Sequence, residues 1–243
     1  MELDKWQEDV VNHEGNIVLR SGRQVGKSTA VWMKAAKFAL KHDKVVILII
    51  AASQRQSWIL FQKVMEELEI EHRKAIEAAG GYIFRTDITE RRNLELQRLF
   101  EIKNGIYAEN PTKSELKLKN GSKIYSVPAG KTGIFLRGYS IDLLLADEAA
   151  FIPEAVWVAI KPMLAVSREI RGMGWQVLLS TPYGKGGYFY DCCLDDDFKH
   201  FHISSESCAR VSKEFLLKEK KRMTRLEYAQ EYLGEFVDEY RQF

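Results

Sequence analysis

The stretch of this sequence that decides the fold runs from residue 20 to residue 29 and reads Arg20-Ser21-Gly22-Arg23-Gln24-Val25-Gly26-Lys27-Ser28-Thr29. A short aliphatic run, Ile17 to Leu19, comes before it, and helix-forming residues from Ala30 to Leu40 come after it. The order is therefore strand, loop, helix. The helix that starts here points the positive end of its dipole at the loop, which favours a bound anion.

Gly26-Lys27-Ser28 is the core of a phosphate-binding loop, or P-loop. In such a loop, successive backbone N–H groups surround phosphate oxygens, the lysine ammonium reaches the β and γ phosphates, and the hydroxyl binds magnesium. The strict pattern has glycine five residues before Gly26, where this chain has Ser21, with Gly22 beside it. A turn on a surface loop is the alternative, but the flanking strand and helix are what phosphate binding requires. We predict that residues 21–29 bind a nucleotide.

Two acidic residues, Asp147 and Glu148, close a second aliphatic run, Ile141 to Ala146. Together with a P-loop earlier in the chain, Asp147 is expected to hold the magnesium ion, and Glu148 to orient and polarise the attacking water. Two acids that end an apolar strand can also be a plain strand exit. Glu148 separates two functions, because a hydrolase needs this carboxylate and a nucleotide-sensing switch does not.

Two further aliphatic runs, Val45 to Ala51 and Trp175 to Leu179, are typical of strands buried on both faces of a parallel sheet. Strands that alternate with helices predict an α/β fold with a mainly parallel central sheet flanked by helices, in which ligands bind at the carboxyl ends of the strands. Ser180-Thr181-Pro182 follows one such strand. We expect Ser180 and Thr181 to contact the γ-phosphate, although a capping turn is the alternative.

Other segments are placed by weaker signals. Residues 2–11 have the apolar spacing of a short helix, and Ser53 can cap a helix that runs to about Ile70. Alternating apolar residues around Asn120-Gly121 predict an inserted β-hairpin over Glu115 to Val127. A last strand over Phe198 to Ile203 and two helices, Ser212 to Met223 and Arg225 to Phe236, complete the prediction.

Composition excludes several classes of protein. Thirty-six basic and 34 acidic residues give a formal net charge of +2, so binding to a polyanion must be local. Cys192, Cys193 and Cys208 lack the spacing of a zinc site or a disulfide framework, which favours a reducing compartment. The longest apolar run, Val45 to Ala52, is too short to span a bilayer, and the acidic N-terminus lacks a signal sequence. The sequence therefore predicts a cytosolic protein without a membrane partner.

Three more residues are candidates for the nucleotide site. The Gln7 carboxamide places a donor beside an acceptor, which matches the N6 and N7 edge of adenine and favours ATP over GTP; the alternative is a surface glutamine. Arg23 lies inside the loop and could balance γ-phosphate charge in cis. Arg137 precedes Gly138 and could be presented by a neighbouring subunit in trans, or be an ordinary surface arginine.

These residues resemble one family, the large terminase subunit of tailed bacteriophages and related viruses, in its ATPase domain. The resemblance covers nearly the whole chain. It rests on five motifs, Trp6-Gln7, Gly22-Arg23-Gln24-Val25-Gly26-Lys27-Ser28, Leu136-Arg137-Gly138, Leu145-Ala146-Asp147-Glu148-Ala149-Ala150-Phe151 and Ser180-Thr181-Pro182. The P-loop and the Asp-Glu-Ala-Ala-Phe run are the specific parts. The resemblance implies a RecA-like P-loop NTPase fold of the ASCE type, and a motor that uses ATP and Mg²⁺ to move double-stranded DNA into a procapsid.

The resemblance also implies roles and partners. Gln7 would contact adenine, Lys27 and Ser28 would hold phosphate and magnesium, residues 180–182 would couple hydrolysis to movement, and Arg23 or Arg137 would be the arginine finger. Family members act as a ring in the cytoplasm of the infected host cell, docked on the portal protein and aided by a small terminase subunit. We expect an ATPase core over residues 1–205 and a helical lid or linker over residues 206–243. The family's nuclease domain would begin where this sequence stops, so we expect no nuclease activity from the chain.

Two basic clusters could meet DNA phosphates without reading sequence. One lies on and before the hairpin, and the other lies in the first C-terminal helix; they comprise Lys103, Lys113, Lys117, Lys119 and Lys123, and Lys218, Lys220, Lys221 and Arg222. Solvated, edge-protecting lysines are the alternative, and the small net charge predicts weak DNA binding. Two other functions stay open, one lobe of a superfamily 2 helicase-like translocase and a regulatory module that binds nucleotide without turnover.

Overall fold

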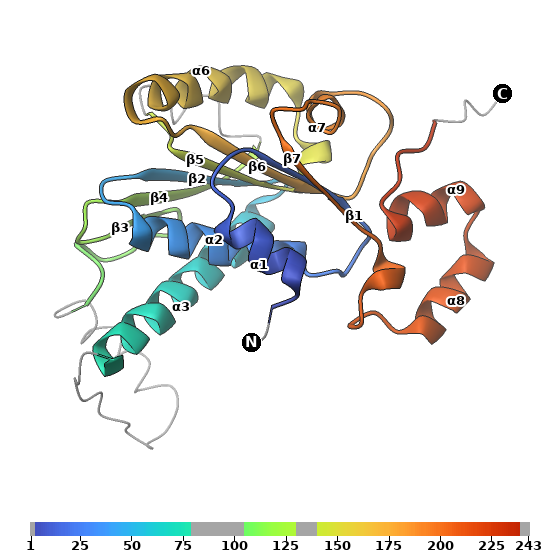
Figure 1. The fold of residues 1–243 in the computed structure, drawn as a ribbon, viewed down its shortest axis with the longest axis horizontal. Helices are drawn as coiled ribbons and strands as arrows, with labels where there is room; N and C mark the ends of the chain where they lie inside the picture. The colour runs from blue at the N-terminus through green and yellow to red at the C-terminus, as the bar shows by residue number, and fades with distance from the viewer. Residues whose placement is uncertain (1–2, 79–104, 130–139, 239–243) are drawn as a thin grey trace.

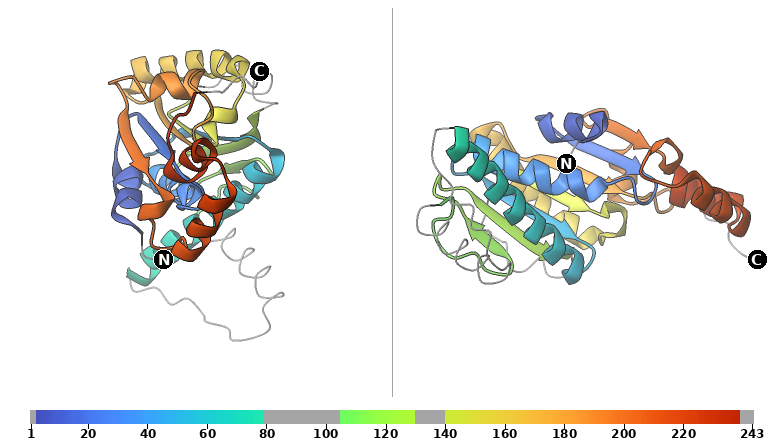
Figure 2. Two further views of the ribbon diagram at one scale, coloured as in Figure 1. Left: turned by 90° about the vertical axis from the view of Figure 1, so that its right-hand side faces the viewer. Right: turned by 90° about the horizontal axis from the view of Figure 1, so that it is seen from below.

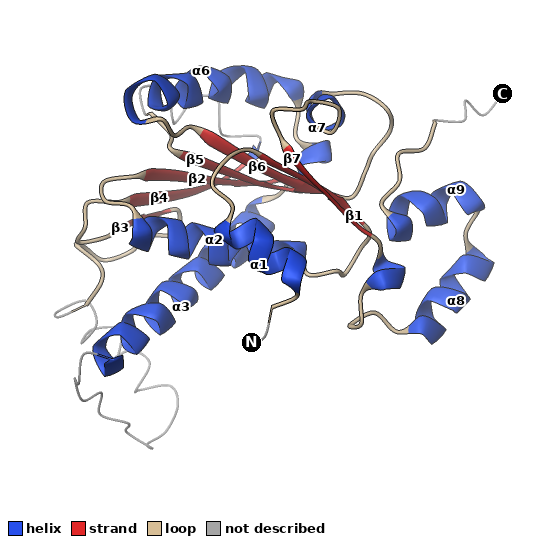
Figure 3. Cartoon of the chain, viewed as in Figure 1, coloured by secondary structure: helices blue, strands red, loops and turns tan. Residues whose placement is uncertain are grey.

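Seven strands form one twisted sheet at the centre of the computed structural model, which describes residues 3–78, 105–129 and 140–238 (Figures 1 and 3). Their order is β3-β4-β2-β5-β6-β1-β7. Only the edge pair β3 and β4 is antiparallel among these strands. The strands span Ile17–Ser21 (β1), Val46–Ala51 (β2), Glu115–Lys117 (β3), Lys123–Pro128 (β4), Leu143–Asp147 (β5), Trp175–Ser180 (β6) and Lys199–Ile203 (β7). The predicted α/β fold with a mainly parallel sheet is confirmed.

Helices cover both faces of the sheet (Figure 2). One face is covered by α1 (Lys5–Asn12), α2 (Lys27–Lys41) and α3 (Gln54–Ala78), and the other by α6 (Glu154–Arg171) and α7 (Tyr188–Cys192). Alternate residues of β2 supply the two cores, because Ile47 and Ile49 pack on the first face and Leu48 and Ile50 on the second. This two-sided burial explains why the strand is a continuous aliphatic run.

The predicted elements differ from the observed ones mainly at their ends. Ser53 caps α3 as expected, accepting from the Gln56 N–H at 3.2 Å, but the helix extends beyond Ile70 to Ala78. The hairpin of β3 and β4 forms around Gly121, and β4 is also the parallel neighbour of β2. It is therefore an integral part of the sheet and not only an inserted piece. The sequence analysis did not place α6 or α7.

The chain after β7 forms a group of short helices beside the carboxyl ends of β1 and β7 (Figure 1). They are η3 (Ser205–Ser207), α8 (Lys213–Arg222), α9 (Arg225–Tyr228) and η4 (Ala229–Leu233), and we refer to residues 204–234 as the C-terminal helical segment. Ser212 and Thr224 cap α8 and α9, as their positions before helix-forming runs predict. The domain division at residue 205 stays a prediction. In the part of the chain that the structure describes, no helix is long and apolar enough to cross a membrane.

A buried carboxylate ties the sheet to α6 at the end opposite the predicted site. Asp142 is 1% exposed and accepts from the Ser167 hydroxyl, from the Val46 N–H at 2.7 Å and from the Arg171 guanidinium at 2.8 Å. Arg171 also donates to the carbonyl oxygen of Asp43 at 3.0 Å. One side chain therefore joins β2, β5 and α6, which sets how α6 lies on the sheet.

We expect Asp142→Ala to lower the free energy of unfolding by roughly 2–4 kcal/mol, because three donors lose a shared acceptor. Chemical denaturation of the purified chain measures this. The exposed neighbour Asp43 offers a matched control, since only its carbonyl contacts Arg171, and Asp43→Ala should stay within about 0.5 kcal/mol of the wild type. Equal losses in the two variants would contradict the assignment.

Candidate functional site

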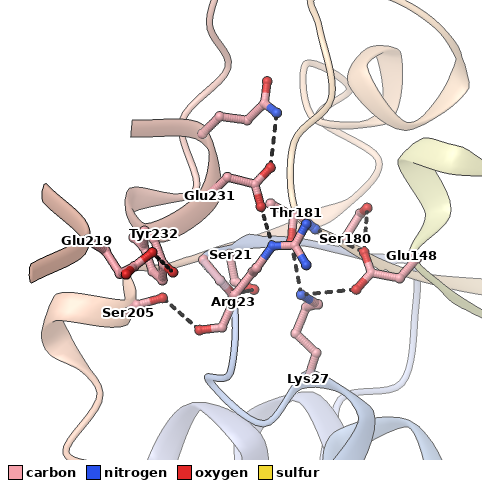
Figure 4. A network of polar contacts seen from close by, with 12 residues as sticks. Ser21, Arg23, Lys27, Glu148, Ser180, Thr181, Ser205, Glu219, Glu231 and Tyr232 are labelled. Carbon is pink, nitrogen blue, oxygen red and sulfur yellow. Dashed lines mark hydrogen bonds and ion pairs between the residues drawn. The ribbon is translucent and has the colours of Figure 1, made fainter. Parts of the chain in front are cut away.

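The carboxyl ends of β1, β5 and β6 bring the predicted lysine and acids to one place (Figure 4). Lys27 is the first residue of α2, and its Nζ lies 3.5 Å from Glu148 Oε1. The same ammonium donates to Thr181 Oγ1 at 3.3 Å. Lys27 is buried, so its charge interacts with these groups in a medium less polar than water. Three segments far apart in the sequence thus meet around one cation.

Beside this cation, a hydroxyl and a carboxylate form a second contact. Ser28 Oγ donates to Asp147 Oδ2 at 3.0 Å. Burial raises the pKa of Asp147 to about 6 and the charge of Glu148 adds to this, whereas Lys27 and the Ser28 hydrogen bond act in the opposite direction. Oxygen ligands of this kind are what Mg²⁺ prefers, so the pair could hold that ion. A divalent cation would relieve the cost of burying the charged carboxylate.

Glu148 adopts an unusual backbone conformation. Its φ is +53°, in the left-handed region that residues with a side chain seldom occupy. The carboxylate points toward the end of β6, where Oε2 accepts from Ser180 Oγ at 3.3 Å. Strain of this kind is kept only where the surrounding structure imposes it, and it is concentrated at functional sites.

The loop that precedes α2 has the backbone of an anion site. Gly26 is the N-cap of α2 with φ of +89°, and Gln24 also has a positive φ of +61°. No side chain caps α2, and Thr29, half-buried in the first turn, donates its N–H to the Gly26 carbonyl at 3.2 Å. An uncapped first turn leaves backbone N–H groups for a ligand. The loop therefore has the geometry that its sequence predicts.

Gln7 lies against this loop and not on the surface. It is 2% exposed, its Nε2 donates to the Gly26 carbonyl at 3.0 Å, and its Oε1 accepts from the Asp4 N–H at 3.0 Å. The alternative of a surface glutamine is therefore wrong, while its contact with adenine stays a prediction. Lys34 holds this helix in place by donating to the Val10 carbonyl at 3.0 Å, and burial lowers the pKa of Lys34 to about 8.

Arg23 is bound to the C-terminal helical segment. Its guanidinium pairs with the Glu231 carboxylate, its N–H donates to the Glu231 carbonyl at 2.8 Å, and its own carbonyl accepts from Ser205 Oγ at 2.7 Å. The ion pair raises the pKa of Arg23. Figure 4 shows the guanidinium between Glu231 and the group formed by Lys27 and Glu148. Arg137, the other predicted finger, lies outside the described residues.

The departure from the strict P-loop pattern has a steric cause. A methyl group on Gly22 would lie 2.2 Å from Ser205 Oγ and 2.2 Å from the Tyr232 carbonyl oxygen. Ser21 is buried and donates its hydroxyl to the Gly22 carbonyl at 3.0 Å. The glycine is thus required at the position where the C-terminal helical segment approaches the loop most closely.

Sequence reasoning missed the residues by which this segment contacts the loop. Val25 is fully buried in a hydrophobic cluster whose other buried members all belong to residues 208–232, and these are Cys208, Val211, Leu216, Tyr228 and Tyr232. Glu231 and Ser205 add the polar contacts described above. No motif marks them, because they act through contacts between segments about 180 residues or more apart. An exposed aromatic pair, Phe151 and Tyr183, with ring centroids 4.9 Å apart, was also missed.

The fold and this site define a P-loop NTPase. A family model described as "Terminase large subunit, T4likevirus-type, N-terminal" matches residues 18–241. The chain belongs to the terminase large subunit family.

Relatives and solved structures agree with this assignment. The chain is 28% identical to the large terminase subunits of Thermus phage G20c and Thermus virus P23-45 over 239 residues, which cover 89% of this chain and 44% of each relative. It therefore spans about half the length of these curated relatives. The large terminase ATPase domain of Thermus phage P74-26 has the same fold, with a TM-score of 0.69 and 24% identity over 97% of this chain and 94% of that one. The large terminase of another thermophilic bacteriophage, in complex with ATP-gamma-S, gives 0.61 and 13%, over 97% of this chain and 53% of that one.

We expect Gly22→Ala to destabilise the chain by roughly 1–3 kcal/mol, because the added methyl group forces the C-terminal helical segment away from the loop. Thermal unfolding measures the loss, and ATP titration of the folded protein should show weaker binding. Gly186→Ala is the matched control, since nothing lies within 4 Å of its added carbon. If the two variants unfold at the same temperature, the close approach at Gly22 does not matter.

Proposed function

We propose that this chain is the ATP-hydrolysing part of a viral DNA-packaging motor. One observation carries the proposal: Lys27, Glu148 and the Ser28 and Asp147 pair converge at one edge of the sheet, within hydrogen-bonding or ion-pairing distance of one another. A lysine, a metal-binding hydroxyl and carboxylate, and a base are the groups that phosphoanhydride hydrolysis needs. Membership of the terminase family supports the wider role.

In this mechanism, the P-loop and Lys27 bind the β and γ phosphates of ATP, and Ser28 with Asp147 would hold Mg²⁺. The ion, when bound, neutralises charge on the phosphate oxygens. Glu148 orients the attacking water and accepts its proton, since Ser180 already fixes the direction of the carboxylate. Breaking of the γ-phosphate bond would change the contacts of Lys27 with Thr181, which couples the chemistry to β6.

Two arginines remain candidates for the positive charge that stabilises the transition state. Arg23 would act in cis after leaving Glu231, with which it pairs in this structure. Arg137 would act in trans from a neighbouring subunit of a ring. Gln7 would supply a donor and an acceptor to adenine.

The substrate of the motor would be double-stranded DNA, bound weakly through its backbone. Many of the candidate cations already have acidic partners, since Lys117 pairs with Glu109, and Lys218 with Glu214 at 2.7 Å. This pairing supports weak and sequence-independent contact. We propose the portal protein, the small terminase subunit and a nuclease domain as the other partners, at the procapsid in the host cytoplasm.

Glu148→Gln tests hydrolysis directly. We expect it to lower the rate of phosphate release at least about 100-fold, because the amide cannot accept the proton of the attacking water, while ATP still binds. Steady-state phosphate release and equilibrium nucleotide binding measure the two effects. Glu154→Gln, on the exposed first turn of α6, is the matched control and should keep full activity. Undiminished turnover in Glu148→Gln would favour a module that binds nucleotide without hydrolysing it.

A mixing experiment tests the trans role of Arg137. Arg137→Ala and Glu148→Gln proteins, each inactive alone, should regain part of the phosphate release when mixed in equal amounts. The reason is that some interfaces then combine an intact Glu148 with an intact Arg137 from the neighbour. A mixture no more active than its components would leave Arg23 as the finger.

A further inference from the structure

Arg210 contacts the P-loop from the connection between η3 and α8. Its Nη2 donates to the Val25 carbonyl at 2.5 Å and to Asp4 Oδ2 at 2.6 Å. One guanidinium group thus joins the C-terminal helical segment, the loop and the residue that precedes α1. Nothing in the P-loop motif or in the predicted roles of Gln7 and Arg23 accounts for it.

Asp4 extends this contact to Gln7. Asp4 is the N-cap of α1, its Oδ2 also accepts from Trp6 Nε1 at 3.2 Å, and its N–H donates to Gln7 Oε1 at 3.0 Å. Gln7 Nε2 then returns to the loop at the Gly26 carbonyl. The result is a closed ring of hydrogen bonds that binds two successive loop carbonyls, those of Val25 and Gly26.

The ring also sets which way the Gln7 amide points. An amide nitrogen has two hydrogens and an amide oxygen two lone pairs, so after these contacts one donor and one acceptor remain. Adenine presents the complementary acceptor at N7 and donor at N6, whereas guanine presents acceptors at both N7 and O6. Rotation of the amide by half a turn would exchange these two positions. The contacts with Asp4 and Gly26 oppose that rotation.

Steric contacts place Arg210 and Gln7 on the same side of the loop. A carbon added to Gly26 would lie 2.9 Å from Gln7 Nε2 and 3.1 Å from Arg210 Nη2. The side chains of Arg210 and Asp4 are 44% and 41% exposed, so their ion pair adds little to the stability of the fold. Its larger effect is geometric, because a planar guanidinium fixes two acceptors relative to each other.

We propose that Arg210 is a positioning residue that, with Asp4, holds Gln7 and the P-loop in the arrangement that selects ATP over GTP. The inference rests on the proposed function, because it concerns the base of the nucleotide hydrolysed at that site. Arg210 acts through Asp4, Val25 and Gln7 and takes no part in the chemical step.

The test compares Arg210→Met, Arg210→Lys and Asp4→Asn with the wild type, in the full chain. We expect Arg210→Met to raise KM for ATP about tenfold, to change kcat less than about twofold, and to lower the ATP to GTP ratio of kcat/KM about tenfold. Arg210→Lys should recover part of both effects, since it keeps the charge without the fork. Combining Arg210→Met with Asp4→Asn should cost no more than Arg210→Met alone, because both remove the same contact.

The control and the contrary results are distinct. Arg225→Met changes another exposed arginine of the same segment and should leave KM and the ATP to GTP ratio unaltered. A lower melting temperature and lower kcat with unchanged KM and ratio would mean a structural role only, and a lower KM would mean that Arg210 obstructs the site; either result overturns the proposal. A wild-type chain that hydrolyses neither nucleotide would refute the proposed function itself.

Discussion

The parallel register of β5, β6 and β1 is the constraint on which the rest of the structure depends. It sets Asp147 level with Leu179, and Leu179 level with Leu19, so the three strands end at one edge of the sheet. Each strand is buried on both faces, and a shift of one residue would expose apolar side chains. The packing of the core therefore fixes where Lys27 and Glu148 meet, before any ligand is bound.

A second constraint acts on the loop itself. The C-terminal helical segment contacts the P-loop at successive residues, through the backbone of Gly22 and Arg23 and through the side chain of Val25. A change in the loop caused by phosphate must therefore be felt by this segment, and the reverse also holds. The segment is thus part of the nucleotide site, and its ion pairs and apolar contacts provide a physical route between hydrolysis and movement.

Much of the site was accessible from the sequence because its chemistry is local. The run from Ser21 to Thr29 and the pair Asp147 and Glu148 identify themselves by residue type and spacing, and strand endings predict that they meet. Gln7 was found for its chemistry, but its burial was not, since burial depends on α1 packing beside the loop. Arg210 and Glu231 were not found at all, because no local pattern distinguishes them from other surface charges.

The sequence by itself determined the class of fold, the order of its elements and the identity of the catalytic groups, because hydrophobic periodicity and short motifs are local properties of a chain. Only the tertiary structure decided why glycine stands at position 22, where the backbone of Tyr232 leaves no room for a side chain. It alone also decided that Arg23 pairs with Glu231 and that Arg210 reaches Asp4. These contacts join residues more than 200 positions apart, and their geometry exists only after the sheet and the helices have packed.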